Sequence, residues 1–274
     1  MTVLLALAAC ASVATPPGGP VDLDPPEVIS ASIDTNATGV TAGKLELRFN
    51  EVIAERPSGA AGVTLEAIVL VSPRTGSAKV QWNRRSITIE PRGGFRPNTT
   101  YRVTLLPGLA DIRGNISNLP RYYVFSTGPT IAPFSILGRV FDWQAAASAP
   151  GAVVEAVANV GRADSAVYLA VADSLGQFEL GPLDAGRYLV RTFIDGDRNR
   201  DRGVLEKWDT VMVNVTDHRP SVELLAAQRD TAAADIASVE ALDSVWVRVR
   251  LDKPFDPRIR IQPTQVVVQR SDSS

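Results

Sequence analysis

A single stretch of the sequence places oxygen-bearing side chains at a spacing that suits a metal ion. Asp195, Asp197, Asn199 and Asp201 occupy positions 1, 3, 5 and 7 of a loop in which Glu206 falls at position 12. This is the spacing of the twelve-residue Ca²⁺ loop, whose alternate residues point inward at a hard cation. One interpretation is therefore a Ca²⁺ site that stiffens a loop, since nothing in the stretch indicates catalysis.

The same stretch also fits a hairpin tip exposed to water. Position 6 is Arg200, where the Ca²⁺ loop has glycine for a sharp turn, and residues 190–194 have the pattern of a strand rather than a helix. Arg198 and Arg202 further dilute the negative field. Asp and Asn side chains commonly form local turns with their own backbone at such tips, so both interpretations stay open.

Other candidates for chemistry are few. The chain has one Cys and one His, which excludes a disulfide framework and zinc sites built from several Cys and His. A catalytic triad would have to use His218, which precedes Arg219-Pro220 in a linker-like segment. Asn50, Glu51 and Asp111 are interpreted as strand-edge and turn polarity rather than as a carboxylate cluster. We therefore expect no enzyme.

The N-terminal residues resemble the end of a bacterial lipoprotein signal. Residues 1–10 read MTVLLALAAC, and Leu7-Ala8-Ala9-Cys10 resembles a lipobox, in which Cys10 would be cleaved to the N-terminus and acylated. No basic residue precedes the apolar run, so the signal would be clipped. Residues 11–24 are a Pro/Gly-rich tether, and Ala11, by resemblance to enterobacterial sorting, favours the outer membrane. The alternative is an apolar N-terminal strand with a buried cysteine.

The first domain, 25–128, is predicted as a β-sandwich. Short runs of alternating apolar residues, such as LELRF at 45–49 and TYRVTL at 100–105, are separated by turn signals. PPEVIS, LELRFNE, PNTTYRVTLLPGLADIRGN and YVFSTG resemble, in this order, a bacterial Ig-like domain of the surface-layer and adhesin type. The resemblance implies a structural or adhesive module, with Phe49 and Tyr101 in the core and Asp111, Gly114 and Asn115 in the turn before the last strand.

A second domain is predicted over 133–216, and it contains the Asp195–Glu206 stretch. DSLGQFELGPL at 173–183, followed by AGRY at 185–188, resembles the carboxypeptidase-regulatory-like, transthyretin-like β-sandwich. Members of these families are binding or spacer modules. The predicted loop would therefore connect two strands of a sandwich.

The remaining residues predict a linker over 217–242 and a partial third β unit over 243–274. Residues 245–251 read VWVRVRL and alternate strongly. The order of an Asp-initiated segment, an Ile/Val-Ser pair and an alternating strand repeats that of the first domain, which indicates the start of a second, incomplete Ig-like repeat. The predicted fold is all-β, with tandem antiparallel sandwiches.

Charge and architecture together limit the function. The formal net charge of −2, with mixed signs, argues against a nucleic-acid partner. We expect a non-enzymatic, lipid-anchored protein of the cell envelope, in the outer membrane, that serves as a structural, spacer or interaction scaffold. The alternative is a module that binds a polysaccharide or protein at the cell surface. Tryptophans could stack on sugars there, although they are spread through the chain and more often anchor cores or edges: Trp82, Trp143, Trp208 and Trp246.

Overall fold

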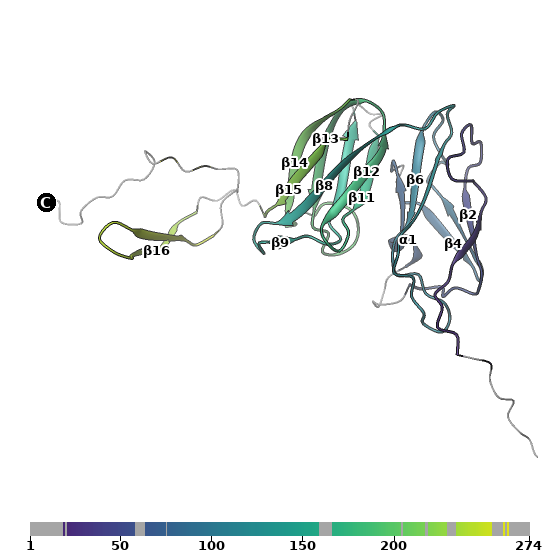
Figure 1. Ribbon diagram of the computed structural model, residues 1–274, viewed down its shortest axis with the longest axis horizontal. Coiled ribbons are helices and arrows are strands. Elements are labelled where there is room, and N and C mark those ends of the chain that lie inside the picture. Colours follow the sequence, from purple (N-terminus) through teal and green to yellow (C-terminus); the bar gives the residue numbers. More distant parts are fainter. Residues whose placement is uncertain are drawn as a thin grey trace, which may run out of the picture.

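The computed structural model describes residues 19, 21–57, 64–74, 76–158, 166–203, 205–216, 219–228, 234–253, 260 and 262. Two β-sandwiches stand side by side, and a two-stranded hairpin lies beyond the second of them (Figure 1). The single helix among these residues is α1 (Leu65–Ile68), a single short turn. The prediction of an all-β fold is confirmed.

The first sandwich consists of two antiparallel sheets. One has the strand order β1-β2-β5-β4 and the other has the order β3-β6-β7. Their strands are β1 (Val28–Ala31), β2 (Leu45–Phe49), β3 (Val69–Ser72), β4 (Lys79–Asn83), β5 (Ser86–Glu90), β6 (Thr100–Leu105) and β7 (Arg121–Ser126). The apolar residues from Leu65 to Val71 divide between two elements, because Leu65–Ile68 form α1 and the following residues enter β3.

The core of the first sandwich follows the alternation of its strands. Leu45, Leu47 and Phe49 on β2 point inward and are 0%, 0% and 2% exposed, because alternate residues of a strand face the same side. Tyr101 on β6 is fully buried and packs edge-on against Phe95, at a ring distance of 4.8 Å. The predicted core positions of Phe49 and Tyr101 are confirmed.

The second sandwich also has two sheets, in the strand orders β11-β10-β13-β14 and β12-β8-β15, with β9 paired to β8. Their strands are β8 (Phe134–Asp142), β9 (Ala147–Ser148), β10 (Val153–Ala158), β11 (Val167–Val171), β12 (Gln177–Leu183), β13 (Gly186–Phe193), β14 (Trp208–Val215) and β15 (Ser221–Ala226). The boundary predicted at 216 is therefore wrong. β15 lies parallel to β8 and buries Leu224 and Ala226 in the core, so this domain continues past residue 216.

The hairpin beyond the second sandwich pairs β16 (Ile236–Ala241) with β17 (Val247–Leu251). Residues 217–242 were predicted as a linker, which is wrong for the residues of β15 and of β16. The alternation of β17 was recognised, and the Asp-initiated segment before it was matched to the opening segment of the first domain, although its residues were assigned to the linker. Residues 263–274, the end of the predicted third unit, lie outside the described residues.

Replacing Tyr101 by Phe tests how the first core is organised. The Tyr101 hydroxyl accepts a hydrogen bond from the Arg96 N–H at 2.7 Å. Its removal leaves that donor without its partner, so we expect the free energy of unfolding to fall by about 1 kcal/mol in urea titrations. Tyr122→Phe is the control, because its ring is 49% exposed, and it should stay within about 0.5 kcal/mol. Equal losses in both variants would contradict this account.

Candidate functional site

The predicted metal loop is the tip of the β13–β14 hairpin. The two strands pair up to Phe193 opposite Trp208, and the Ile194 N–H then donates to the Lys207 carbonyl at 3.0 Å. A carboxylate oxygen from each of Asp195, Asp197 and Glu206 lies within 4.8 Å of the others. The structure thus brings together three of the five residues that the spacing predicted as ligands.

The other two predicted ligands make different contacts. The Asn199 amide nitrogen donates to Asp197 Oδ2 at 2.8 Å, and its oxygen accepts the Asp201 N–H at 2.6 Å. The Asp201 carboxylate points away and pairs with Arg74 of the first sandwich at 2.9 Å. Asn199 therefore lies beside the acidic group, whereas the Asp201 side chain is committed to the neighbouring domain.

The three clustered carboxylates repel one another. Burial raises the pKa of Asp195 above its ordinary value, and hydrogen bonding to Asp197 and the charge of Glu206 raise it further. The N–H of Arg200 donates to Asp195 Oδ2 at 2.9 Å and acts in the opposite direction. Backbone donors also hold Glu206, through Gly196 at 3.0 Å and Gly203 at 2.8 Å. Backbone N–H groups therefore offset part of the charge, and a divalent cation would offset more.

Arg200 explains why the loop departs from the glycine pattern. Its φ is +61°, the left-handed conformation for which the Ca²⁺ loop uses glycine at this position. The side chain leaves the loop and enters the first sandwich. There the guanidinium donates to the carbonyls of Val69 at 2.7 Å, Glu66 at 3.3 Å and Ala67. The loop keeps the backbone geometry and uses the side chain to dock the two domains.

A buried carboxylate reinforces this joint between the sandwiches. Glu155 on β10 is 1% exposed and lies between two guanidinium groups. Arg74 of the first sandwich approaches Glu155 Oε1 at 3.3 Å, and Arg191 on β13 holds Oε2. The Arg74 guanidinium also donates to the Arg200 carbonyl at 3.1 Å. The ion pair is thus completed by a residue from the opposite domain.

Apolar packing and backbone bonds complete the joint. Leu70 on β3 packs into a buried cluster with Val153, Leu169 and Phe193 of the second sandwich. The Leu169 N–H donates to the Ser72 hydroxyl at 2.9 Å. The Arg74 N–H donates to the Val167 carbonyl at 2.7 Å. The outer face of the sheet with β3 therefore contacts the outer face of the sheet with β10, β11 and β13. Nothing in the sequence predicted this contact between the two domains.

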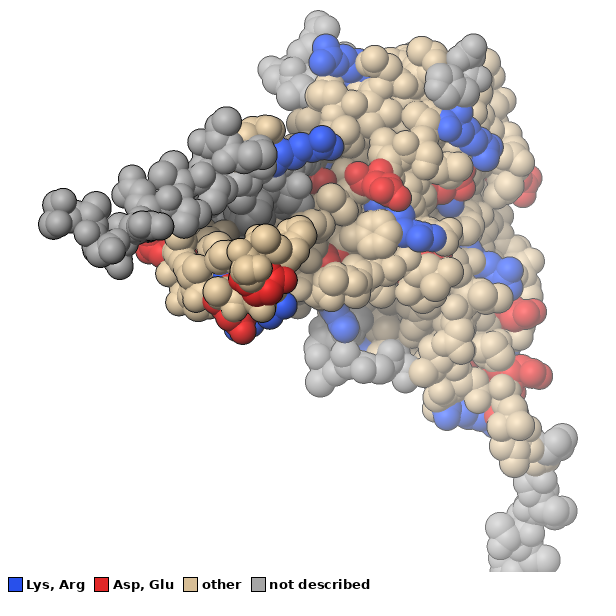
Figure 2. Space-filling view, turned by 60° about the vertical axis from the view of Figure 1, so that its left-hand side comes forward, with Lys and Arg blue, Asp and Glu red and all other residues tan. Residues whose placement is uncertain are grey.

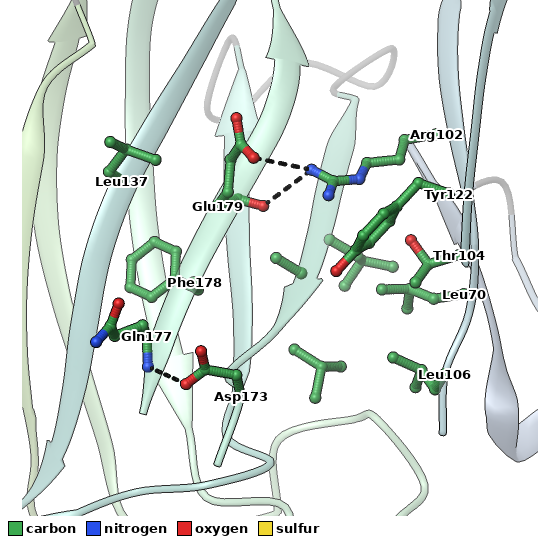
Figure 3. Close-up of a pocket in the computed structure, with 13 residues that line it drawn as sticks. Leu70, Arg102, Thr104, Leu106, Tyr122, Leu137, Asp173, Gln177, Phe178 and Glu179 are labelled. Carbon is green, nitrogen blue, oxygen red and sulfur yellow. Dashed lines mark hydrogen bonds and ion pairs between the residues drawn. The ribbon is translucent and has the colours of Figure 1, made fainter. Parts of the chain in front are cut away.

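A cleft of about 330 Å³ opens beside the joint, between β6 and β7 on one side and β12 on the other (Figure 3). The Arg102 guanidinium lies 4.1 Å from the centre of the Tyr122 ring. It also reaches the Glu179 carbonyl at 3.3 Å and a Glu179 carboxylate oxygen at 3.9 Å. The Asp173 carboxylate accepts the Gln177 N–H at 2.8 Å. Arg102 of the first sandwich and Glu179 of the second therefore bind each other across the cleft, which extends the joint.

A second acidic group lies on the first sandwich. Carboxylate oxygens of Asp22, Glu51 and Asp111 lie within 4.8 Å of one another. Burial and the charges of Asp111 and Asp22 raise the pKa of Glu51. Burial opposes ionisation of Asp111, but hydrogen bonds from Asn115 and Arg113 outweigh it and lower the Asp111 pKa. Asp111 is a turn residue as predicted. The interpretation that Glu51 and Asp111 do not form a carboxylate cluster is wrong, and the closeness of Asp22 was missed.

The four tryptophans considered as sugar-stacking residues lie on different parts of the molecule. Trp82 is on β4 and donates to the Ile53 carbonyl at 3.1 Å, whereas Trp143 follows β8. Trp208 lies under the Arg202 guanidinium at 4.8 Å, and Trp246 belongs to the separate hairpin. No ring contact between two tryptophans occurs within the described ranges. On the face drawn in Figure 2, charges of both signs alternate without a field of one sign.

Two residues of the sequence-based expectations, Cys10 and His218, lie outside the described residues. Within the parts of the chain that are described, no helix is long and apolar enough to cross a membrane. The acylation of Cys10 therefore stays a prediction.

Comparison with known proteins assigns the first domain. Residues 22–127 match the family model described as a bacterial Ig-like domain, and no curated protein matches the chain. Among solved structures, the N-terminal part of the bacterial S-layer protein SbsC aligns at 12% identity and a TM-score of 0.27, covering 70% of this chain and 44% of that one. BcpA, the major pilin subunit of Bacillus cereus, aligns at 12% identity and a TM-score of 0.24, covering 74% of this chain and 71% of that one.

The chain thus spans less than half the length of that S-layer fragment. The carboxypeptidase-regulatory-like assignment of the second sandwich stays a prediction. Strands β1 to β7 all lie within residues 22–127, and these residues belong to the part of the chain that matches the bacterial Ig-like domain family, as the resemblance of residues 25–128 implied.

Proposed function

We propose that this chain is a non-enzymatic structural module of the bacterial cell envelope, in which two sandwiches act as one stiff spacer. The joint carries this proposal. Domains of one chain usually move relative to each other unless their interface is large and apolar. Here Leu70 is buried against the second sandwich, Glu155 is enclosed by arginines, and Arg200 enters the first sandwich. A spacer or presenting scaffold benefits from such a fixed joint.

The bacterial Ig-like domain supports the same function. An Ig-like sandwich supplies a stable body whose loops and edges are free to vary. In this chain its outer sheet face, through Ser72 and Leu70, is used to hold a second sandwich. The proposed role is therefore mechanical and presentational, with any ligand bound at the ends or edges of the paired domains.

The envelope location is proposed to depend on acylation of Cys10. The preceding Leu7-Ala8-Ala9 resemble a lipobox, and the following Pro/Gly-rich residues resemble a tether. Acyl chains hold a protein at a bilayer by burying CH₂ groups, each worth about 0.8 kcal/mol. The tether would then separate the first sandwich from the membrane surface.

The loop at the tip of β13–β14 is proposed to bind Ca²⁺. Asp195, Asp197 and Glu206 supply the clustered carboxylates, Asn199 supplies an amide, and Asp201 was the fifth predicted ligand. Oxygen ligands of this kind suit a hard cation. Because Arg200 belongs to the same loop, an ion held there would stiffen the segment that docks on the first sandwich.

Replacing Arg200 by Ala tests the stiff joint. The variant loses the charged donor to three carbonyl groups, worth roughly 1.5–3 kcal/mol. The Leu169 and Arg74 amides, whose hydrogen bonds cross the joint, should then exchange with solvent about 10- to 100-fold faster. Arg198→Ala is the matched control, because Arg198 is an exposed arginine of the same loop with φ of +60°. Equal exchange rates in both variants would refute a joint held by Arg200.

Replacing Cys10 by Ser tests the anchor in cells. The chain is expressed with a complete signal peptide, and membranes are separated from the soluble fraction. We expect Cys10→Ser to release the protein because serine cannot carry the thioether-linked lipid. Ala11→Asp should keep the protein in a membrane fraction but move it from the outer to the inner membrane. Membrane retention of the serine variant would contradict lipid anchoring at this residue.

Calcium titration distinguishes the two acidic groups. If the loop binds Ca²⁺ with a Kd of about 10 μM, 1 mM Ca²⁺ should stabilise the chain by about 2.7 kcal/mol and raise its melting temperature. Glu206→Gln should abolish the shift. Glu51→Gln, in the other cluster of three carboxylates, should leave it intact. A wild type that melts at the same temperature with and without Ca²⁺, or loss of the shift only in Glu51→Gln, would overturn the assignment.

A further inference from the structure

Several asparagines of this chain are followed, two residues later, by a serine or threonine, with no proline between. This Asn-X-Ser/Thr pattern is the sequon, the acceptor motif for N-linked glycosylation of secreted proteins. An acceptor must present both the amide of the asparagine and the following hydroxyl to an enzyme, so the structure separates usable sequons from unusable ones. The asparagines concerned are Asn36, Asn98, Asn115 and Asn214.

Two of these sequons have a required group that is committed within the fold. The Asn115 amide nitrogen donates to the Asp22 carbonyl at 3.1 Å and to Asp111 Oδ2 at 2.8 Å, so both of its protons are used. The hydroxyl that follows Asn98 belongs to Thr100, which is 9% exposed and accepts a backbone N–H at 2.9 Å. Neither sequon offers an enzyme a free amide together with a free hydroxyl.

A third sequon lies within strand β14. Asn214 pairs opposite Arg187 of β13, and its neighbours Val213 and Val215 are 5% and 1% exposed. An acceptor asparagine has to enter the active site of a transferase while the chain leaves on both sides. This segment would have to separate from β13 and lose its buried valines to do so.

Asn36, by contrast, lies in an exposed turn between β1 and β2. The Ala37 N–H donates to the Asp34 carbonyl at 3.2 Å, which closes the turn, and Asn36 has a φ of +66°. Asparagine tolerates this left-handed conformation better than most residues. Asp34, Asn36 and Thr38 are all exposed. Within the described part of the chain, no group hydrogen-bonds to the Asn36 amide group or to the Thr38 hydroxyl.

The turn accounts for an asparagine at position 36 but not for the residues around it. A turn with a positive φ at its third residue favours Gly or Asn there, and it requires no hydroxyl two residues later. Asp34 also places an exposed carboxylate two residues before the asparagine, which offers an enzyme a charged contact. The corresponding positions of the other sequons have no acid and are Arg96, Arg113 and Met212.

Main-chain hydrogen bonds fix this turn at one edge of the first sandwich. The Asn36 N–H donates to the Val124 carbonyl of β7 at 2.6 Å, and the Ser126 N–H donates to the Ala37 carbonyl at 2.8 Å. β7 lies at the opposite edge of its sheet from β3, which carries Leu70 of the joint. A group attached to the Asn36 side chain would therefore leave the Leu70 contact unchanged.

We propose that Asn36 is the acceptor of an N-linked saccharide. The Asn36 amide nitrogen attacks the anomeric carbon of a saccharide that is carried on a lipid pyrophosphate. A C–N bond forms and the C–O bond to the pyrophosphate breaks. The lipid pyrophosphate leaves with the electron pair of that bond, and one amide proton passes to a base of the transferase. The Thr38 hydroxyl is the recognition group.

This assignment rests on the envelope location proposed above in one respect, because acceptors of N-linked glycans are secreted. The two proposals are tested separately. Fractionation of the Cys10→Ser variant in cells bears on the anchor alone. Transfer of a saccharide to the purified chain bears on Asn36 alone, because it does not depend on where the chain is located in cells.

Transfer to the purified, folded full chain is the test. The chain is incubated with a bacterial oligosaccharyltransferase and a lipid-pyrophosphate saccharide, and glycopeptides are identified by mass spectrometry. We expect a single saccharide, on Asn36. Thr38→Val should reduce transfer roughly tenfold or more, because the sequon requires a hydroxyl at this position, whereas Thr38→Ser should retain it. Asn98→Gln is the matched control and should be modified as the wild type is.

A synthetic peptide of residues 31–42 is tested beside the folded chain. Transfer to the peptide but not to the chain would overturn the proposal, because it would show the turn to be inaccessible in the protein. Failure of both, beside an unrelated acceptor peptide that is modified, would overturn it as well. So would a saccharide on Asn98, Asn115 or Asn214 in place of Asn36, or equal transfer to the Thr38→Val and Thr38→Ser variants.

Discussion

The buried carboxylate of Glu155 is the group on which the arrangement of the two domains depends most. An isolated carboxylate taken out of water costs several kcal/mol. Glu155 is 1% exposed, and one of the two guanidinium groups that compensate it, Arg74, belongs to the other sandwich. If the domains separated, Arg191 would remain and water would reach the carboxylate. The docking of the two domains therefore decides whether the Glu155 charge is compensated by Arg74 or by water.

Arg200 shows how one position can satisfy two demands. A left-handed backbone costs a residue with a side chain roughly 1–2 kcal/mol, and Arg200 adopts it with φ of +61°. Its guanidinium gains hydrogen bonds to carbonyls at the end of α1, where the last turn of a helix leaves acceptors free. These hydrogen bonds between the domains offset the conformational cost of Arg200 in the loop. The conformation of the loop and the docking of the two domains therefore depend on the same residue.

The sequence predicted local features well and the contacts between domains poorly. Alternation identified the inward faces of β2 and β6, since a strand's period fixes which residues share a side. The spacing from Asp195 to Glu206 brought three carboxylates together as expected. Arg200, by contrast, was interpreted as a departure from the Ca²⁺ loop. Its role in docking could not be predicted because it depends on contacts near α1, more than a hundred residues away in the sequence. β15 was missed because its parallel partner, β8, begins the domain.

The repeated hairpin separates two things that usually occur together. β1–β2 and β16–β17 reach the same register, the same bulge and the same side-chain closure, yet Leu47 is fully buried and Val249 is 48% exposed. The register of such a pair is therefore encoded in its own residues, through alternation and the Asn50 or Asp252 side chain, and does not require a covering sheet. What the cover adds is burial of the apolar face.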